Sequence, residues 1–233
     1  MFLFMILFLP LISIFLCLHS SDKSVIVVSG LGFIFGIVEC FFIALFLYMH
    51  KVLENSFLNV FLHFFVNENF LPILIAYLIY FFATKDSVEF RLKAFFPFAV
   101  AFYSVYFPYF LIASDGVVYS FFDLFLHSLM IFSMLFFVTI SLVNVYNFAK
   151  NKSVSRIILH SFIALVVIVL PSVFESLIYM KIFTLLAYAL VIAYVLLGIV
   201  YFFVSVRIIT ESLCNNKGIN CKTNFGRRNC RHC

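Results

Sequence analysis

The sequence predicts an all-α integral membrane protein, a polytopic bundle of about seven transmembrane helices with its N-terminus outside and its C-terminus in the cytoplasm. Two observations lead to this prediction. Hydrophobic residues make up 66% of the chain and charged residues 11%, whereas soluble domains have about 45–50% and about 25%. Most of the charged residues also lie in short gaps between long apolar runs or in the C-terminal tail. A soluble fold could not cover its surface with so few polar side chains, but a bilayer accepts Phe and Leu there.

Each apolar run is long enough to cross the hydrocarbon core of a bilayer, which takes about 20 helical residues. The predicted spans are residues 1–18, 25–49, 57–83, 94–113, 117–146, 157–177 and 182–206. The first run has no basic residues before it and no A-x-A-like cleavage site, so we interpret it as a retained span. Residues 1–206 thus form one transmembrane domain, and residues 207–233 form a short, basic, Cys-rich cytoplasmic tail that we expect to be disordered.

The third run leaves an alternative open, because it could divide at Asn67-Glu68-Asn69 and cross twice. Its first part, Phe57–Val66, would however be only about 15 Å long as a helix, which is too short to cross. We therefore expect residues 57–83 to form one span.

The distribution of basic residues predicts the orientation. Short cytoplasmic loops are enriched in Lys and Arg. Every basic residue except Lys51 and Lys181 lies in an odd-numbered gap or in the tail. We therefore predict that those gaps and the tail are cytoplasmic. The positive net charge is explained by this topology, and we predict no nucleic-acid partner. The predicted location is the inner membrane, and the first predicted partner is the lipid bilayer.

A stripe of small side chains marks the second span. Gly32, Gly36, Cys40 and Ala44 recur every four residues, so they lie on one helix face and allow another helix to approach closely. We predict helix packing within the chain, with a homodimer contact as the alternative.

Five ionisable residues fall inside the predicted spans, where such groups usually face the bundle interior and have a partner. They are Glu39, His63, Glu68, Asp123 and His127. Asp123 and His127 stand at i and i+4 on one helix face. A carboxylate there stabilises a protonated imidazole, which makes the pair a candidate proton acceptor or pH-sensitive element. Hydrogen bonding between helices, without a ligand or proton site, is the other interpretation.

Two further charged residues are expected to be hydrated and to have no role. Glu175 and Lys181 lie at the outer ends of the last two spans. A charged side chain costs little free energy close to the aqueous surface. We therefore predict that the polar site consists of the five residues named above.

The tail contains four cysteines whose spacing fits a structural zinc site poorly. Cys214, Cys221, Cys230 and Cys233 include only one C-x2-C pair, whereas such sites usually have two close ligand pairs. We predict no metal and no cofactor. The tail is interpreted as a positive anchor; a hypothesis is that it is the out-of-frame end of a longer protein, because Phe and Leu almost vanish after Glu211.

Short motifs carry a family resemblance. They are Gly32-Phe-Ile-Phe-Gly36, the segment from Leu47-Tyr-Met-His-Lys51 to Asn55-Ser-Phe-Leu58, and Arg91-Leu-Lys-Ala-Phe-Phe-Pro97-Phe. In this order they resemble the seven-helix membrane sensor regions of bacterial signalling proteins, particularly those joined to a helix-turn-helix DNA-binding domain. The resemblance implies a sensory function over residues 30–205. In that family a soluble domain delivers the output, whereas here only residues 207–233 follow the last span.

Two functions follow as expectations. The first is a sensory or signalling module without a catalytic domain, which would require a ligand and a membrane or cytoplasmic partner protein. The second is a small-solute transporter or permease component that uses the intramembrane carboxylates and histidines. A broken helix around Asn67 would favour transport, and an uninterrupted third span would favour the sensor. We expect no enzyme, because G-x-S-x-G and H-E-x-x-H motifs are absent.

Overall fold

The computed structural model describes residues 11–12, 23–49, 56–83, 88–113 and 121–216, and within these ranges it contains helices and no strands. The all-α prediction is confirmed for that part of the chain. The helices are α3 (Lys23–Met49), α4 (Phe57–Leu62), the π-helix η1 (His63–Phe70), α5 (Leu71–Ala83), α6 (Val88–Ala113), α7 (Phe121–Lys150), α8 (Val154–Tyr179) and α9 (Thr184–Asn216). The predicted first span lies outside the described residues apart from 11–12, as do residues 217–233 of the tail.

The chain divides into two compact units, Met1–Gly198 and Ile199–Cys233. The described part of the second unit, residues 199–216, is the continuation of α9. That helix passes the predicted end at Val206 and reaches Asn216. The first residues of the predicted tail are therefore helical, not disordered.

Among the described residues, three helices are long and apolar enough to cross a membrane: Phe125–Lys150, Val154–Tyr179 and Thr184–Val204. A shorter apolar stretch, Ile26–Phe41, lies in α3. Large apolar side chains on these helices are uncovered, for example Phe162, which is 62% exposed, and Leu185, which is 88% exposed. Many exposed large apolar side chains on neighbouring parts of a surface indicate contact with lipid.

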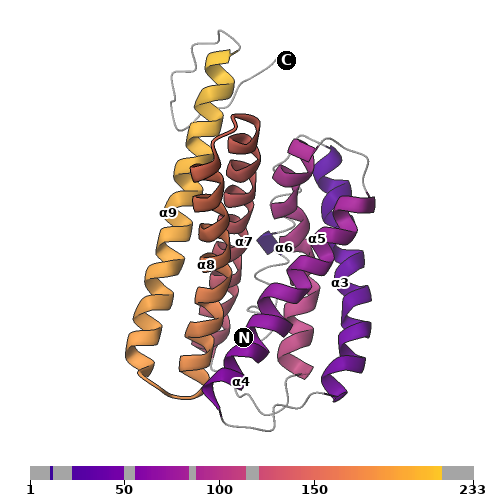
Figure 1. Ribbon diagram of the computed structural model, residues 1–233. Helices are drawn as coiled ribbons and strands as arrows, with labels where there is room; N and C mark the ends of the chain where they lie inside the picture. The colour runs from indigo at the N-terminus through magenta and orange to yellow at the C-terminus, as the bar shows by residue number, and fades with distance from the viewer. Residues whose placement is uncertain (1–10, 13–22, 50–55, 84–87, 114–120, 217–233) are drawn as a thin grey trace. The chain divides into compact units, whose positions relative to one another are not determined.

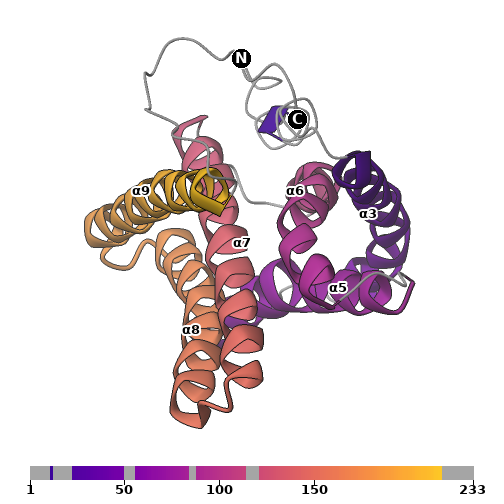
Figure 2. The ribbon, with the colours of Figure 1, turned by 90° about the horizontal axis from the view of Figure 1, so that it is seen from above.

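The first unit contains two helix groups. In the N-terminal group α3 and α5 both pack on α6, and in the C-terminal group α7 and α8 form an antiparallel pair. The two groups lie on opposite sides in Figure 2. They meet where α6 contacts α7 and where α4 and η1 contact α8.

Glycines bring α3 against α6. A Cβ atom at Gly32 would overlap the carbonyl oxygen of Phe98, and one at Gly36 would lie 2.7 Å from the carbonyl oxygen of Phe102. Cys40 continues the stripe, with its Sγ 4.0 Å from the carbonyl oxygen of Val105. The structure thus places three of the four predicted packing residues at a helix contact within the chain; the side chain of Ala44 lies outside the described residues.

The turns of the C-terminal group are tight. Lys152 after α7 and Lys181 after α8 both have positive φ, 54° and 56°. After α7 the amide of Ser153 donates to the carbonyl of Phe148 at 3.0 Å. This pattern is a Schellman motif, which satisfies the last carbonyls of a helix and reverses the chain within a few residues.

Aromatic and small residues fix α9 on this pair. The Tyr194 hydroxyl donates to the carbonyl of Val167 at 3.1 Å, and its ring lies against Phe137 with centroids 5.7 Å apart. A Cβ atom at Gly198 would lie 2.5 Å from the Cβ of Ser133. The helix can therefore approach α7 closely at Gly198.

The glycine contact predicts a position-specific loss of stability. Gly32→Ala should lower the free energy of unfolding by about 1–3 kcal/mol, because the added methyl group meets rigid backbone of α6. Gly30→Ala is the matched control, because nothing lies within 4 Å of a Cβ atom there. Thermal unfolding of both variants in detergent micelles measures the difference. Equal melting temperatures would contradict this packing.

Candidate functional site

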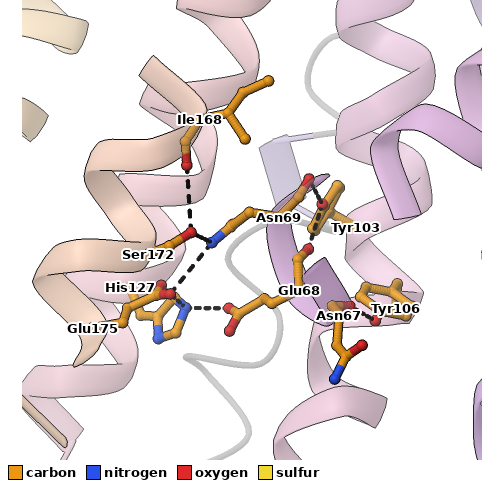
Figure 3. Close-up of polar contacts among 9 residues, drawn as sticks. All are labelled: Asn67, Glu68, Asn69, Tyr103, Tyr106, His127, Ile168, Ser172 and Glu175. Carbon is orange, nitrogen blue, oxygen red and sulfur yellow. Dashed lines mark hydrogen bonds and ion pairs between the residues drawn. The ribbon is translucent and has the colours of Figure 1, made fainter. Parts of the chain in front are cut away.

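Three buried ionisable side chains from three separate helices meet in the first unit. Glu68 comes from η1, His127 from α7 and Glu175 from α8, and they are 0%, 5% and 6% exposed. His127 Nε2 contacts Glu68 Oε1 and lies 2.6 Å from Glu175 Oε1. Figure 3 shows the Glu68 carboxylate directed across the gap between the helix groups toward the imidazole. We call these residues the Glu–His–Glu cluster.

Neutral polar groups hold the far side of the cluster. Asn69 Nδ2 donates to Ser172 Oγ at 2.9 Å and to Glu175 Oε2 at 3.4 Å. Asn69 and Ser172 are both fully buried. These contacts orient the Glu175 carboxylate toward His127, because its second oxygen is held by an amide (Figure 3).

The π-helix positions Glu68. Its wider turn frees backbone carbonyls from the α-helical pattern, and π-segments inside helices are frequent at functional sites. Tyr103 of α6 donates to the carbonyl of Glu68 at 2.7 Å, and Tyr106 donates to the carbonyl of Asn67. These hydroxyls fix η1 on α6 (Figure 3).

Charge is the main physical constraint at the cluster. The charges of two ionised carboxylates cannot be neutralised by one imidazole. Even when His127 is protonated, one negative charge remains. An uncompensated charge in a low-dielectric interior is costly, by several kcal/mol per ion. The cluster must therefore hold shared protons or a bound cation.

Two of the predicted site residues, Glu68 and His127, come together here. Glu39 is buried on α3, 9% exposed, and lies outside the cluster. His63 lies in η1, where its Nδ1 is 3.1 Å from Asn67 Nδ2. Asp123 belongs to α7, but its side chain lies outside the described residues. His127 contacts Glu68 of η1 and Glu175 of α8, and its pairing with Asp123 stays a prediction.

The prediction that Glu175 is hydrated is wrong. Helix α8 extends to Tyr179, so Glu175 lies inside it and is 6% exposed. The signal that sequence reasoning missed is the spacing of Ser172, Glu175 and Ser176, which places three polar side chains on one helix face. All three are buried. Lys181 is exposed, in the turn after α8.

The structure does not describe the side chains of the tail cysteines. Cys214 lies in α9, with its side chain outside the described residues. Cys221, Cys230 and Cys233 also lie outside them. The poor zinc candidate in the tail thus stays a sequence-based interpretation.

Comparison with known proteins identifies no relative: no protein-family model, no curated protein and no solved structure matches the chain. The resemblance to bacterial sensor regions thus rests on its short motifs and stays a prediction. Function has to be inferred from the cluster and from the helices that hold it.

The geometry of the cluster predicts that removal of the imidazole leaves the two carboxylates repelling each other. His127→Ala should lower the free energy of unfolding by about 3 kcal/mol, since it leaves two buried carboxylates facing each other. Adding Glu68→Gln should restore part of this loss. His160→Ala is the control, because His160 is half-buried and stacks on Phe148. Unfolding in micelles measures all three. A double variant less stable than His127→Ala alone would contradict an electrostatic origin.

Proposed function

We propose that the chain is a sensory module of a bacterial inner membrane, with seven spans, an outside N-terminus and a cytoplasmic C-terminus, and without a catalytic domain of its own. One observation carries this proposal. The Glu–His–Glu cluster is a charged contact between the two helix groups, with Glu68 on one side and His127 and Glu175 on the other. A signal that changes this contact changes how the groups pack.

The contact has the properties of a switch element. Its members are buried, so a change in their charge is felt strongly in the low-dielectric interior. Glu68 is also held by a π-helix, whose hydrogen-bond register differs from that of its α-helical neighbours. Two arrangements of the same helices, separated by a few kcal/mol, are what a sensor requires.

The ends of the helices support the proposed orientation. Arg91 and Lys93 lie near the start of α6, and Lys150, Lys152 and Arg156 flank the turn between α7 and α8. Because consecutive helices run antiparallel, both sets lie at the same end of the first unit (Figure 1). A concentration of basic residues at one end indicates the cytoplasmic side.

The cluster lies toward the opposite end. His127 is about 9 Å along the axis from Phe121, the first residue of α7, and Glu175 is about 6 Å before the end of α8. In the proposed topology this is the outer end of both helices. A signal from outside the cell would reach the cluster over a short path.

The third span favours the sensor over the alternative transporter. Residues 57–83 are helical throughout, so the span is not unwound at Asn67. The carbonyls that leave the α-helical pattern accept hydrogen bonds from Tyr103 and Tyr106. Discontinuous helices of transporters offer such carbonyls to the substrate or ion, and here tyrosine hydroxyls occupy them.

The orientation predicts which side of the membrane single cysteines face. In a background with the six native cysteines changed to serine, Lys93→Cys and Asn151→Cys should react with a membrane-impermeant maleimide only from the cytoplasmic side. Phe183→Cys, in the turn between α8 and α9, should react only from outside. Labelling of intact cells and of inside-out vesicles measures this. Reaction of Lys93→Cys and Asn151→Cys from opposite sides would contradict the topology.

The sensor proposal predicts movement between the helix groups without solute flux. Spin labels at Lys93→Cys on α6 and Asn151→Cys after α7 report the distance between the groups by pulsed electron resonance. Neutralising the cluster with Glu68→Gln should shift the distance distribution, because the charged contact is lost. His160→Ala should leave the distribution unchanged. An unchanged distribution in Glu68→Gln, with proteoliposome solute uptake that the same variant abolishes, would favour transport instead.

A further inference from the structure

We infer that the Glu–His–Glu cluster binds a divalent first-row transition-metal ion, of which Zn²⁺ is the type, through Glu68, His127 and Glu175. The binding follows from the geometry of the cluster. The further step, that the bound metal is the signal that the protein senses, rests on the proposed function. The proposed ligands do not include the cysteines of the tail.

The first support is the convergence of ligand atoms. Each of the three residues offers one donor atom, and the three atoms lie within 4.8 Å of one another. They come from three helices far apart in sequence, so the fold itself gathers them. A tetrahedral ion with bonds of about 2.0–2.2 Å needs its ligand atoms about 3.4 Å apart. His127 Nε2 and Glu175 Oε1 are 2.6 Å apart, so these two atoms would have to move about 1 Å farther apart to bind an ion. Rotation of the side chains about their torsion angles can provide this movement.

The second support is charge. Two ionised carboxylates and a neutral imidazole are compensated in full by one divalent cation, with no proton placed on any of the three. Such an ion removes the unbalanced charge that otherwise destabilises this buried site. The imidazole then uses its Nε2 lone pair as a ligand.

The third support is a set of polar atoms without partners. Among the described residues, Glu68 Oε2 and Asn69 Oδ1 are buried and accept no hydrogen bond. Both residues are 0% exposed, and a buried acceptor without a partner costs about 1–3 kcal/mol. The Glu68 carboxylate points toward His127 and Glu175 (Figure 3). Its second oxygen, Oε2, is therefore available as a further ligand of an ion.

The donor set indicates the class of metal. Imidazole nitrogen suits Zn²⁺, Fe²⁺ and Ni²⁺, and carboxylate oxygen suits harder ions such as Mn²⁺. One nitrogen with two carboxylates therefore excludes a thiolate-type site and favours Zn²⁺ or Mn²⁺ over Ca²⁺ or Mg²⁺, which take all-oxygen sites. Asn69 supports the ligand Glu175 through its amide, as outer-shell groups do in metal sites.

Metal binding by the purified full-length chain in lipid nanodiscs tests this inference. Cys214, Cys221, Cys230 and Cys233 are changed to serine, so that thiolates of the tail cannot hold zinc. After removal of metal with a chelator and equilibrium dialysis against Zn²⁺ or Mn²⁺, mass spectrometry counts the ions bound per chain. We expect about one ion, and an absorption spectrum of bound Co²⁺ that reports its ligands.

Matched variants assign the ion to the cluster. Glu68→Gln, His127→Ala and Glu175→Gln should each weaken binding at least tenfold, and Asn69→Ala should weaken it by about 10–100-fold. His160→Ala should bind like the parent. Size-exclusion profiles and melting temperatures establish folding, and the Gln variants keep the shape of the side chain that they replace. Ion uptake that stays unchanged in the folded Gln variants, or no uptake at all, would overturn the inference.

The spin-label distance separates the two proposals. Metal uptake without any change in the distance between α6 and α7 would support the metal site and remove the sensor proposal. A distance that responds to acidification, in a protein that takes up no metal, would overturn the metal site and leave the sensor. Uptake that shifts the distance in the parent, and not in Glu175→Gln, supports both.

Discussion

A charge that cannot be left uncompensated in a low-dielectric interior constrains this structure more than any other feature. Glu68, His127 and Glu175 are each almost completely buried. Their free energy in the folded protein is acceptable only because they face one another and because Asn69 and Ser172 take part of their hydrogen-bonding capacity. The cluster thereby links the helices that carry these three residues.

The rest of the first unit places these side chains. The glycines of α3 let α6 lie close, and α6 in turn presents Tyr103 and Tyr106 to the backbone of η1. These hydroxyls provide hydrogen-bond donors for the carbonyls of Glu68 and Asn67, and a buried carbonyl that lacks a partner costs about 1–3 kcal/mol. The π-helix, and with it the direction of Glu68, thus depends on helix packing some distance away from the cluster.

Sequence reasoning could predict an all-α chain with apolar helices of membrane-spanning length, because composition and the length of apolar runs depend on local chemistry. It also selected Glu68 and His127, since ionisable groups in an apolar run are conspicuous. It missed Glu175 because depth was judged from the end of an apolar run, and α8 continues to Tyr179. It paired His127 with Asp123, whose side chain lies outside the described residues. It did not predict the contacts of His127 with Glu68 and Glu175, because contacts between helices depend on tertiary packing that one sequence does not display. The π-helix at His63–Phe70 was foreseen only as a place where the third span could be interrupted.

The contact between Glu68 and His127 is the central claim, and solid-state magnetic resonance in lipid bilayers measures it most directly. With ¹⁵N-labelled histidine and ¹³C-labelled glutamate, dipolar recoupling should detect a short distance from an imidazole nitrogen to a side-chain carboxyl carbon. The signal should weaken in Glu68→Gln and weaken further in His127→Ala, which removes the imidazole. A bilayer sample of the wild-type chain with no such nitrogen–carbon coupling would contradict the contact and the proposals that depend on it.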